Sequence, residues 1–319
     1  MNNFWRSKKV VVTGGSGFIG SHVVDLLVEK GAVVTVQISG KSTEKNLKPN
    51  LLNSSIKVVA GDLTDYNFCN KLLSGQEIVL SFAASDGGSA YKKEHSAEIF
   101  RTNSQITLNI LEASRSNSIK KILIVSSIEV YPESAKQPTA EGEAFRDDLS
   151  EDKDGYAWSK RFSEIAARMY NTQYGLDVSI IRPGNVYGPF DHKDKGRVIP
   201  TFIQQALDGK PITIWNGGRQ LKSFIYVKDL ARAALQVVEK SKKCDPINVA
   251  SEKYLSIKDL AKLIIKTTKS KSTIENVDMP VVLKDKIIDT KKLKEITGFK
   301  EEISIEDGIL NTVMYIKKN

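Results

Sequence analysis

Three glycines near the N-terminus constrain the fold of this chain more than any other feature. Gly14, Gly17 and Gly20 follow the apolar run at residues 10–12 and precede residues 21–31, which carry the apolar spacing of a helix. In such a unit the glycines permit a tight turn, a close approach of the backbone to a pyrophosphate, and close packing of helix on strand. The helix N-terminus offers free N–H groups to phosphates. The pattern therefore predicts a strand, turn and helix that bind a nucleotide cofactor.

Composition limits the other classes of function. The chain has 319 residues, enough for one or two domains, and 40% of them are hydrophobic, as in an ordinary globular protein. No apolar stretch is long enough to span a bilayer and no signal peptide is visible, so we expect a cytoplasmic protein that does not enter membranes. The two cysteines, Cys69 and Cys244, lie far apart, and we expect neither a disulfide framework nor a metal site.

The net charge of +9 raises the question of nucleic-acid binding. The lysines are scattered and lack interleaved aromatic residues, so we expect no nucleic-acid partner. A basic cleft for an anionic, phosphate-bearing substrate fits this charge better.

Strands and helices alternate through the first 180 residues, which predicts an α/β fold with a doubly wound parallel sheet of the Rossmann type. Predicted strands lie at residues 33–38, 56–60, 78–83, 121–126 and 178–182, and helices at 98–115 and 156–174. From residue 183 the pattern is irregular, with helices at 198–207 and 256–267 and a strand at 212–215. We therefore expect a cofactor-binding domain at 1–182, with a return at 224–250, and a smaller mixed α/β substrate lobe at 183–319. Ligands in such folds bind at the carboxyl ends of the strands, between the lobes.

Tyr156 and Lys160 are four residues apart on a predicted helix, where a phenol and an ammonium share one face. A fixed cation lowers the pKa of a phenol from its usual ~10, so Tyr156 could exchange a proton with a substrate alcohol. Ser127 follows a predicted strand and could hydrogen-bond the same oxygen. Tyr254 and Lys258 have the same spacing but no strand-end serine nearby, and we interpret them as a surface pair.

These motifs together resemble the extended short-chain dehydrogenase/reductases, in the group of sugar-nucleotide epimerases and dehydratases. The similarity runs almost end to end, through residues 13–20, 62–63, 83–84, 103, 109–113, 126–131, 156 and 160, 182–189, 224–229 and 307–309. It implies that Ser127, Tyr156 and Lys160 carry the chemistry. It also implies a bound NAD(P), a nucleoside-diphosphate sugar as substrate, and a homodimer formed by the helices at 98–115 and 156–174.

The resemblance also implies two sets of binding residues. Those for the cofactor are Gly14, Gly17, Phe18, Ile19, Gly20, Ser39, Asp62, Leu63, Ala83, Ala84, Asn103, Tyr156, Lys160 and Pro183. Those for the substrate are Asn185, Arg197, Arg219 and Lys222. Lys222 stands where the family usually has a phosphate-binding arginine. Arg219 is near it in the sequence and is the alternative, because its guanidinium could bind a phosphate through two N–H groups.

The form of the cofactor depends on the end of the second strand. NAD-preferring members of the family carry an acidic residue 24 positions after the first glycine, where it bonds the ribose and repels a 2′-phosphate. Ile38 stands there in this chain, with Ser39, Lys41 and Ser42 close by. We therefore predict a preference for NADP, with NAD as the alternative.

Glu129 distinguishes between reactions. A glutamate stands at the similar position in sugar-nucleotide 4,6-dehydratases and UDP-glucuronate decarboxylases, where it could remove a proton from carbon. Ile128 replaces the aspartate that many dehydratases carry beside it. Residues 83–88 and 197–200 look like GDP-fucose synthase and GDP-mannose 3,5-epimerase, but Arg197 replaces the histidine acid of the synthase.

The sequence thus favours an epimerase that acts through a transient keto-sugar at C4. The alternatives are a 4,6-dehydratase that uses Glu129, and a 4-ketoreductase. A non-catalytic NADP-binding regulatory protein is the alternative from another class, and the intact set of Ser127, Tyr156 and Lys160 argues against it.

Overall fold

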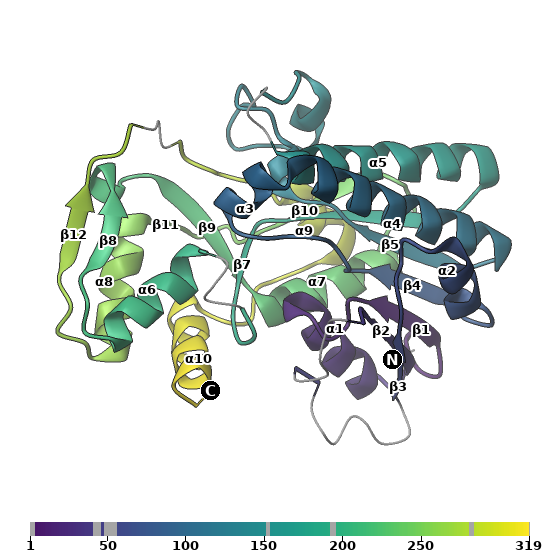
Figure 1. Cartoon of the computed structure of the whole chain (residues 1–319), viewed down its shortest axis with the longest axis horizontal. Coiled ribbons are helices and arrows are strands. Elements are labelled where there is room, and N and C mark those ends of the chain that lie inside the picture. Colours follow the sequence, from purple (N-terminus) through teal and green to yellow (C-terminus); the bar gives the residue numbers. More distant parts are fainter. Residues whose placement is uncertain are drawn as a thin grey trace.

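The protein is described here from a computed structural model that covers residues 4–40, 46–47, 56–150, 154–191, 196–280 and 284–318. Lys41 and Ser42, which bear on the choice of cofactor, lie outside these residues. Seven parallel strands form the central sheet in the order β10-β6-β5-β4-β1-β2-β3 (Figure 1). They are β1 (Lys9–Thr13), β2 (Val33–Ile38), β3 (Ile56–Ala60), β4 (Ile78–Ser81), β5 (Lys121–Val125), β6 (Val178–Pro183) and β10 (Pro246–Val249).

Helices cover both faces of this sheet, as the buried apolar strands of a parallel sheet require. One face packs against α1 (Phe18–Glu29), α7 (Val227–Lys240) and α9 (Lys291–Thr297), and the other against α2 (Tyr66–Leu73), α4 (Ser96–Ser116) and α5 (Gly155–Tyr174). The short helix α3 (Ser89–Glu94) lies beside α4 and α5. The doubly wound fold predicted from the alternation is therefore confirmed.

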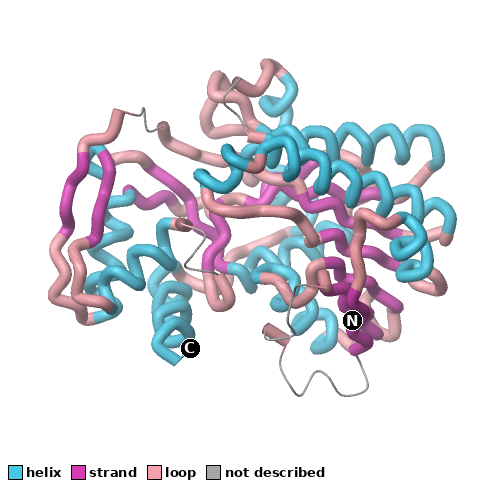
Figure 2. Tube along the Cα trace, viewed as in Figure 1, coloured by secondary structure: helices cyan, strands magenta, loops and turns pink. Residues whose placement is uncertain are grey.

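A second lobe has its own core (Figure 2). It contains the three-stranded sheet of β7 (Asn185–Tyr187), β9 (Leu221–Tyr226) and β11 (Tyr254–Ser256), and the pair β8 (Ile212–Trp215) and β12 (Ile274–Val277). Around them lie α6 (Val198–Leu207), α8 (Ile257–Thr268) and α10 (Ile305–Lys318). The chain passes between the lobes several times, because β9 leads into α7 and β10 returns to the main sheet before β11.

Several predicted bounds differ from the observed ones. β4 ends at Ser81 rather than at residue 83, and α5 begins one residue before Tyr156. Helix α9 packs against α7 and β10 of the main sheet, although the predicted boundary assigned it to the substrate lobe. Tyr254 lies in β11 and not on a helix with Lys258, and its hydroxyl donates to the Ile288 carbonyl at 3.1 Å. No helix in the described part of the chain is long and apolar enough to cross a membrane.

Candidate active site

A cavity of about 1410 Å³ is lined by both lobes. Single-ligand pockets usually measure ~300–1,000 Å³, so this one has room for two ligands side by side. The predicted site residues that line it are Gly14, Gly17, Phe18, Ile19, Gly20, Ser39, Asp62, Leu63, Ala83, Ala84, Ser127, Glu129, Tyr156, Lys160, Pro183, Asn185, Arg197 and Lys222. Asn103 and Arg219 are outside this lining.

The glycine turn between β1 and α1 forms one end of the cavity. Gly14 has φ +63°, and a Cβ on it would lie 2.9 Å from the Ala83 backbone. A Cβ on Gly20 would lie 2.3 Å from the Gly14 carbonyl oxygen, so the helix approaches the turn as closely as glycine allows. Gly17 is the N-cap of α1 and gives no side-chain hydrogen bond to its first turn. The backbone here forms a cradle of the kind that a pyrophosphate requires.

The end of β2 differs from the prediction. Ile38 is 7% exposed and packs in the core, so it is not the residue that faces the cavity. Gln37 lines the cavity instead: its side-chain oxygen accepts from the Gly14 N–H at 3.0 Å and its amide donates to the Gly61 carbonyl at 2.8 Å. Adjacent side chains of a strand point to opposite faces, which explains the displacement by one residue.

Two residues predicted to bind the cofactor have polar contacts of their own. Asp62 accepts from the Thr64 N–H at 2.8 Å, and this hydrogen bond lowers the pKa of its carboxyl group. Asn103 is buried, and its side chain forms hydrogen bonds to the N–H and the carbonyl of Ser85, at 2.7 and 3.1 Å, and to the Ser159 hydroxyl. Asn103 therefore holds the segment that follows β4 rather than lining the cavity.

Helix α5 positions the predicted acid and base. The Asp154 carboxylate caps the helix by accepting from the Ala157 N–H at 3.1 Å, which places Tyr156 in the first turn. The Ser127 side chain lies close enough to the Tyr156 hydroxyl to act on its pKa. One turn later the Lys160 ammonium donates to the Val125 carbonyl at 2.7 Å, and its Nζ lies 5.4 Å from the centre of the Tyr156 ring.

Groups other than Lys160 dominate the pKa of Tyr156, so the effect predicted for Lys160 stays a prediction. Burial raises the pKa of Tyr156 above its ordinary value, and the Asp86 carboxylate raises it further, while Ser127 acts in the opposite direction. Burial also lowers the pKa of Lys160 to about 8, so its ammonium is less favoured here than in water but still predominates at neutral pH. Tyr156 is therefore a neutral phenol at neutral pH.

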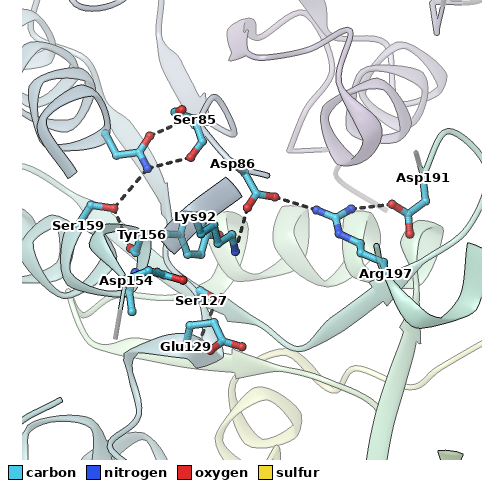
Figure 3. A network of polar contacts seen from close by, with 12 residues as sticks. Ser85, Asp86, Lys92, Ser127, Glu129, Asp154, Tyr156, Ser159, Asp191 and Arg197 are labelled. Atoms are coloured by element: carbon cyan, nitrogen blue, oxygen red, sulfur yellow. Dashed lines mark hydrogen bonds and ion pairs between the residues drawn. The ribbon is translucent and has the colours of Figure 1, made fainter. Parts of the chain in front are cut away.

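Four charged side chains form a network that extends from one side of this tyrosine (Figure 3). The sequence predicted Arg197 as a substrate-binding residue but did not assign Asp86, Lys92 or Asp191 to the site. Asp86 pairs with the Lys92 ammonium at 2.9 Å and with the Arg197 guanidinium at 2.9 Å, and Arg197 also donates to Asp191 at 2.6 Å. The Lys92 Nζ lies 3.9 Å from the centre of the Tyr156 ring. No local motif links these residues, because they come from the segment after β4, from α3 and from the segment before α6.

Glu129 lies at the other side of the reacting end, on the short helical turn at Ile128–Val130. Its carboxylate pairs with the Lys286 ammonium at 2.9 Å. Lys222 is nearby, and its pKa is lowered, first by burial and then by the charge of Lys286. Asn185 donates to the Ser223 carbonyl at 2.9 Å, and Arg219 is exposed. Lys286 carries no sequence signal, since only the crossing of a distant segment brings it to Glu129.

The family model described as "NAD dependent epimerase/dehydratase family" matches residues 10–250. The chain belongs to this family. Its relative dTDP-4-dehydro-6-deoxy-D-allose reductase from a Streptomyces species is 34% identical over 301 residues, 92% of each chain. A UDP-N-acetylglucosamine 4-epimerase from Methanobrevibacter ruminantium is 30% identical, with a TM-score of 0.86 over 98% of this chain and 99% of that one. The same TM-score is found for a dTDP-glucose 4,6-dehydratase from Streptomyces venezuelae with NAD bound, at 25% identity over 98% and 97%.

The residues present fit a nicotinamide dinucleotide. A Cβ on Gly14 or Gly20 would collide with neighbouring backbone, and the cavity continues from this turn to Tyr156 and Lys160. Gly14, Gly17 and the first turn of α1 would hold the pyrophosphate, and Asp62 lies where a polar adenine edge could bond. When bound, the reduced or oxidised nicotinamide gives or takes the hydride that such an enzyme moves.

Proposed function

We propose that this enzyme reduces a keto group at C4 of a nucleoside-diphosphate sugar, with NADPH as the preferred reductant. The observation that carries the proposal is the buried phenol of Tyr156, which lies with Ser127 and Lys160 in the lining of the cavity. Reduction of a ketone needs a proton donor at the oxygen, and a phenol kept protonated by burial is in the required form. The 34% identical relative named as a 4-keto-sugar reductase supports the same direction of reaction.

In this proposal each polar residue has one task. Tyr156 donates its proton to the C4 oxygen, Ser127 hydrogen-bonds the same oxygen, and Lys160 holds a positive charge near the ring. The main-sheet lobe binds the cofactor, and the C-terminal lobe binds the sugar nucleotide through Asn185, Lys222 and residues around them. Arg219 is left out, because its side chain is exposed outside the cavity lining.

The uncharged residues at the end of β2 support the NADP preference. Within the described part of β2 and the turn after it, Gln37, Ser39 and Gly40 line the cavity and none is acidic. A carboxylate at this place would repel a 2′-phosphate, so its absence supports NADP. NAD remains the alternative, held without a carboxylate bond to the ribose.

The decisive experiment is an assay of NADPH consumption. The purified chain is mixed with NADPH and, in separate reactions, with 4-keto-6-deoxy sugars linked to UDP, GDP, dTDP or CDP, and the nicotinamide absorbance is followed. We expect stoichiometric loss of NADPH with one nucleotide series and a C4 alcohol in the product NMR spectrum. Tyr156→Phe is the inactive comparison. Binding of NADPH with no turnover of any sugar nucleotide would favour the regulatory protein over an enzyme.

A C4 epimerase is the second candidate, supported by the 30% identical epimerase structure. Such an enzyme would interconvert two sugar nucleotides without net consumption of cofactor, so incubation with UDP-, GDP-, dTDP- and CDP-sugars followed by NMR distinguishes it. The 4,6-dehydratase has less support. Its base would be Glu129, whose carboxylate is held by Lys286 at 2.9 Å.

We also propose a homodimer through α4 and α5. These two helices pack on each other and leave Phe100, Trp158, Ile165 and Met169 exposed by 38–63%. Light scattering should give twice the chain mass, and Ile165→Asp should reduce it to that of the monomer, because a charge would be buried in the interface.

A further inference from the structure

Two lysines, not one, lie close to the ring of Tyr156. Lys160 is the lysine of the sequence motif, but its Nζ is 5.4 Å from the ring centre and is directed to the Val125 carbonyl. The Lys92 Nζ is 3.9 Å from the ring centre, over the face of the ring. Lys92 lines the cavity and its side chain is 17% exposed. Figure 3 shows it between Tyr156 and Asp86. The nearer cation therefore comes from α3, outside the motif.

The Asp86 carboxylate fixes this geometry. One of its oxygens forms an ion pair with the Lys92 ammonium at 2.9 Å. The other oxygen accepts from the Arg197 guanidinium, which also donates to Asp191. Lys92 thus has a fixed counter-charge on one side and an aromatic face on the other. A cation within ~6 Å of a ring centre is attracted by the electron-rich face of that ring.

We infer that Lys92 is a second positioning lysine of the active site, which acts through Tyr156. The inference rests on the proposed function, in which Tyr156 donates a proton to the substrate oxygen. As that O–H bond breaks, the negative charge left on the phenolate spreads over the ring. A cation above the ring attracts the phenolate more strongly than the neutral phenol, so its contribution grows as the proton moves.

The other charged residues near Tyr156 determine whether each substitution should raise or lower a pKa. Asp86 and Glu129 disfavour the phenolate, and Arg197 favours it. Around Lys160, the carboxylate of Asp86 raises the pKa and the ammonium of Lys92 lowers it. Removing the charge of Lys92 should therefore raise the pKa of Lys160 above about 8. Removing the charge of Asp86 should lower it.

The first experiment does not need turnover. The pKa of Lys160 is measured by NMR titration of the lysine ε-methylene signals in the folded protein, with its signal assigned by loss in Lys160→Arg. We expect a higher value in Lys92→Met, a lower value in Asp86→Asn, and no change in Lys93→Met. Lys93 is the matched control, because it is the next residue of α3 and is exposed. Lys92→Gln replaces Lys92→Met if the latter does not fold.

The second experiment uses the reductase assay. We expect Lys92→Met to lower kcat about tenfold, the worth of one pKa unit, with KM nearly unchanged, and Lys92→Arg to restore kcat. In the direction that oxidises the alcohol, the rate rises as Tyr156 loses its proton, and this rise should move to higher pH in Lys92→Met. Lys93→Met should match the wild type in every measurement.

Each outcome decides a different claim. If Lys92→Met behaves as Lys93→Met in both experiments, Lys92 is only the partner of Asp86 and the inference is wrong. A rise in KM with unchanged kcat and an unchanged pKa of Lys160 would make Lys92 a substrate-binding residue and would also overturn it. Absence of turnover by the wild-type chain contradicts the proposed function alone, because the titration of Lys160 still decides whether the field of Lys92 reaches this helix.

Discussion

The two ends of the cavity are built by different means. At the cofactor end, the backbone at Gly14, Gly17 and Gly20 lines the cavity. The uncharged side chain of Gln37 lies beside this turn. At the reacting end, charged side chains dominate, and they form the pairs Asp86–Lys92, Asp86–Arg197 and Glu129–Lys286. Cofactor binding at the first end depends on the shape of the backbone, and a methyl group added to one of these glycines would disturb it. The second depends on charge, so substitutions there should change rates and pH dependence before they change folding.

The largest effect is expected at the charged end. Tyr156→Phe keeps the ring over which Lys92 lies but removes the proton, and should lower kcat by about 10²–10⁴. Cofactor binding should persist, because the cradle is untouched. Tyr254→Phe is the control, since its hydroxyl donates to the Ile288 carbonyl at 3.1 Å and Tyr254 lies in β11, away from the glycine turn and α5. Turnover of Tyr156→Phe at the wild-type rate would remove this hydroxyl from the mechanism.

At the cofactor end of the cavity, substitutions should act through the shape of the backbone. In Gly20→Ala the new Cβ would lie 2.3 Å from the Gly14 carbonyl, so the turn must move. We expect a loss of about 1–3 kcal/mol in the free energy of unfolding, together with weaker binding of the dinucleotide. Gly142→Ala is the matched substitution, because nothing lies within 4 Å of its Cβ. Calorimetry of both variants with and without NADPH checks this, and equal stability would show that the turn is not tightly packed.

Burial of Lys160 should make stability depend on pH in the alkaline range. Burial lowers its pKa to about 8 from 10.5, so between these values the unfolded chain binds more protons than the folded one. Stability from this group therefore rises as pH increases from about 8 to 10.5, by on the order of 1–3 kcal/mol. The test is the difference in unfolding free energy between wild type and Lys160→Met across this range. A constant difference would mean that Lys160 stays charged in the fold.

The choice of cofactor offers a smaller test at the cradle end. Ser39→Asp places a carboxylate in the cavity lining beside Gln37, where it would face a 2′-phosphate. We expect the affinity for NADPH relative to NADH to fall about tenfold, by charge repulsion of about 1.4 kcal/mol. Ile38→Asp should instead destabilise the fold, because Ile38 is packed in the core. Tighter binding of NADH than NADPH by the wild type would contradict the proposed preference.

The difference between the two ends of the cavity also explains which site residues could be predicted from the sequence. The glycine turn and the pair Tyr156 and Lys160 are local patterns, so their spacing alone indicated a cradle and a helix face. Lys92 and Lys286 reach the site through tertiary packing, and no spacing marks them. The burial of Ile38 and the position of Gln37 in the cavity lining could not be predicted, because at a strand end one residue decides which face of the sheet a side chain meets.

Substitution of Glu129 should have the smallest effect on kcat, and it distinguishes most clearly between the candidate reactions. A C4 reduction moves one hydride and one hydroxyl proton, so no carbon acid is needed, and Glu129→Gln should reduce kcat by less than about fivefold. The Glu129–Lys286 ion pair would be lost, and such a half-exposed pair stabilises the fold by only about 0–1 kcal/mol.

A reaction in heavy water, followed by NMR of the purified product, shows directly whether a carbon-bound proton is removed. Deuterium bound to C3, C5 or C6, and lost in Glu129→Gln, would identify a carboxylate that removes a proton from carbon. The reductase would then be replaced by a dehydratase or by an enzyme that epimerises a carbon beside the ketone. Product free of such deuterium, from wild type and variant alike, leaves Glu129 as the partner of Lys286 at the charged end of the cavity.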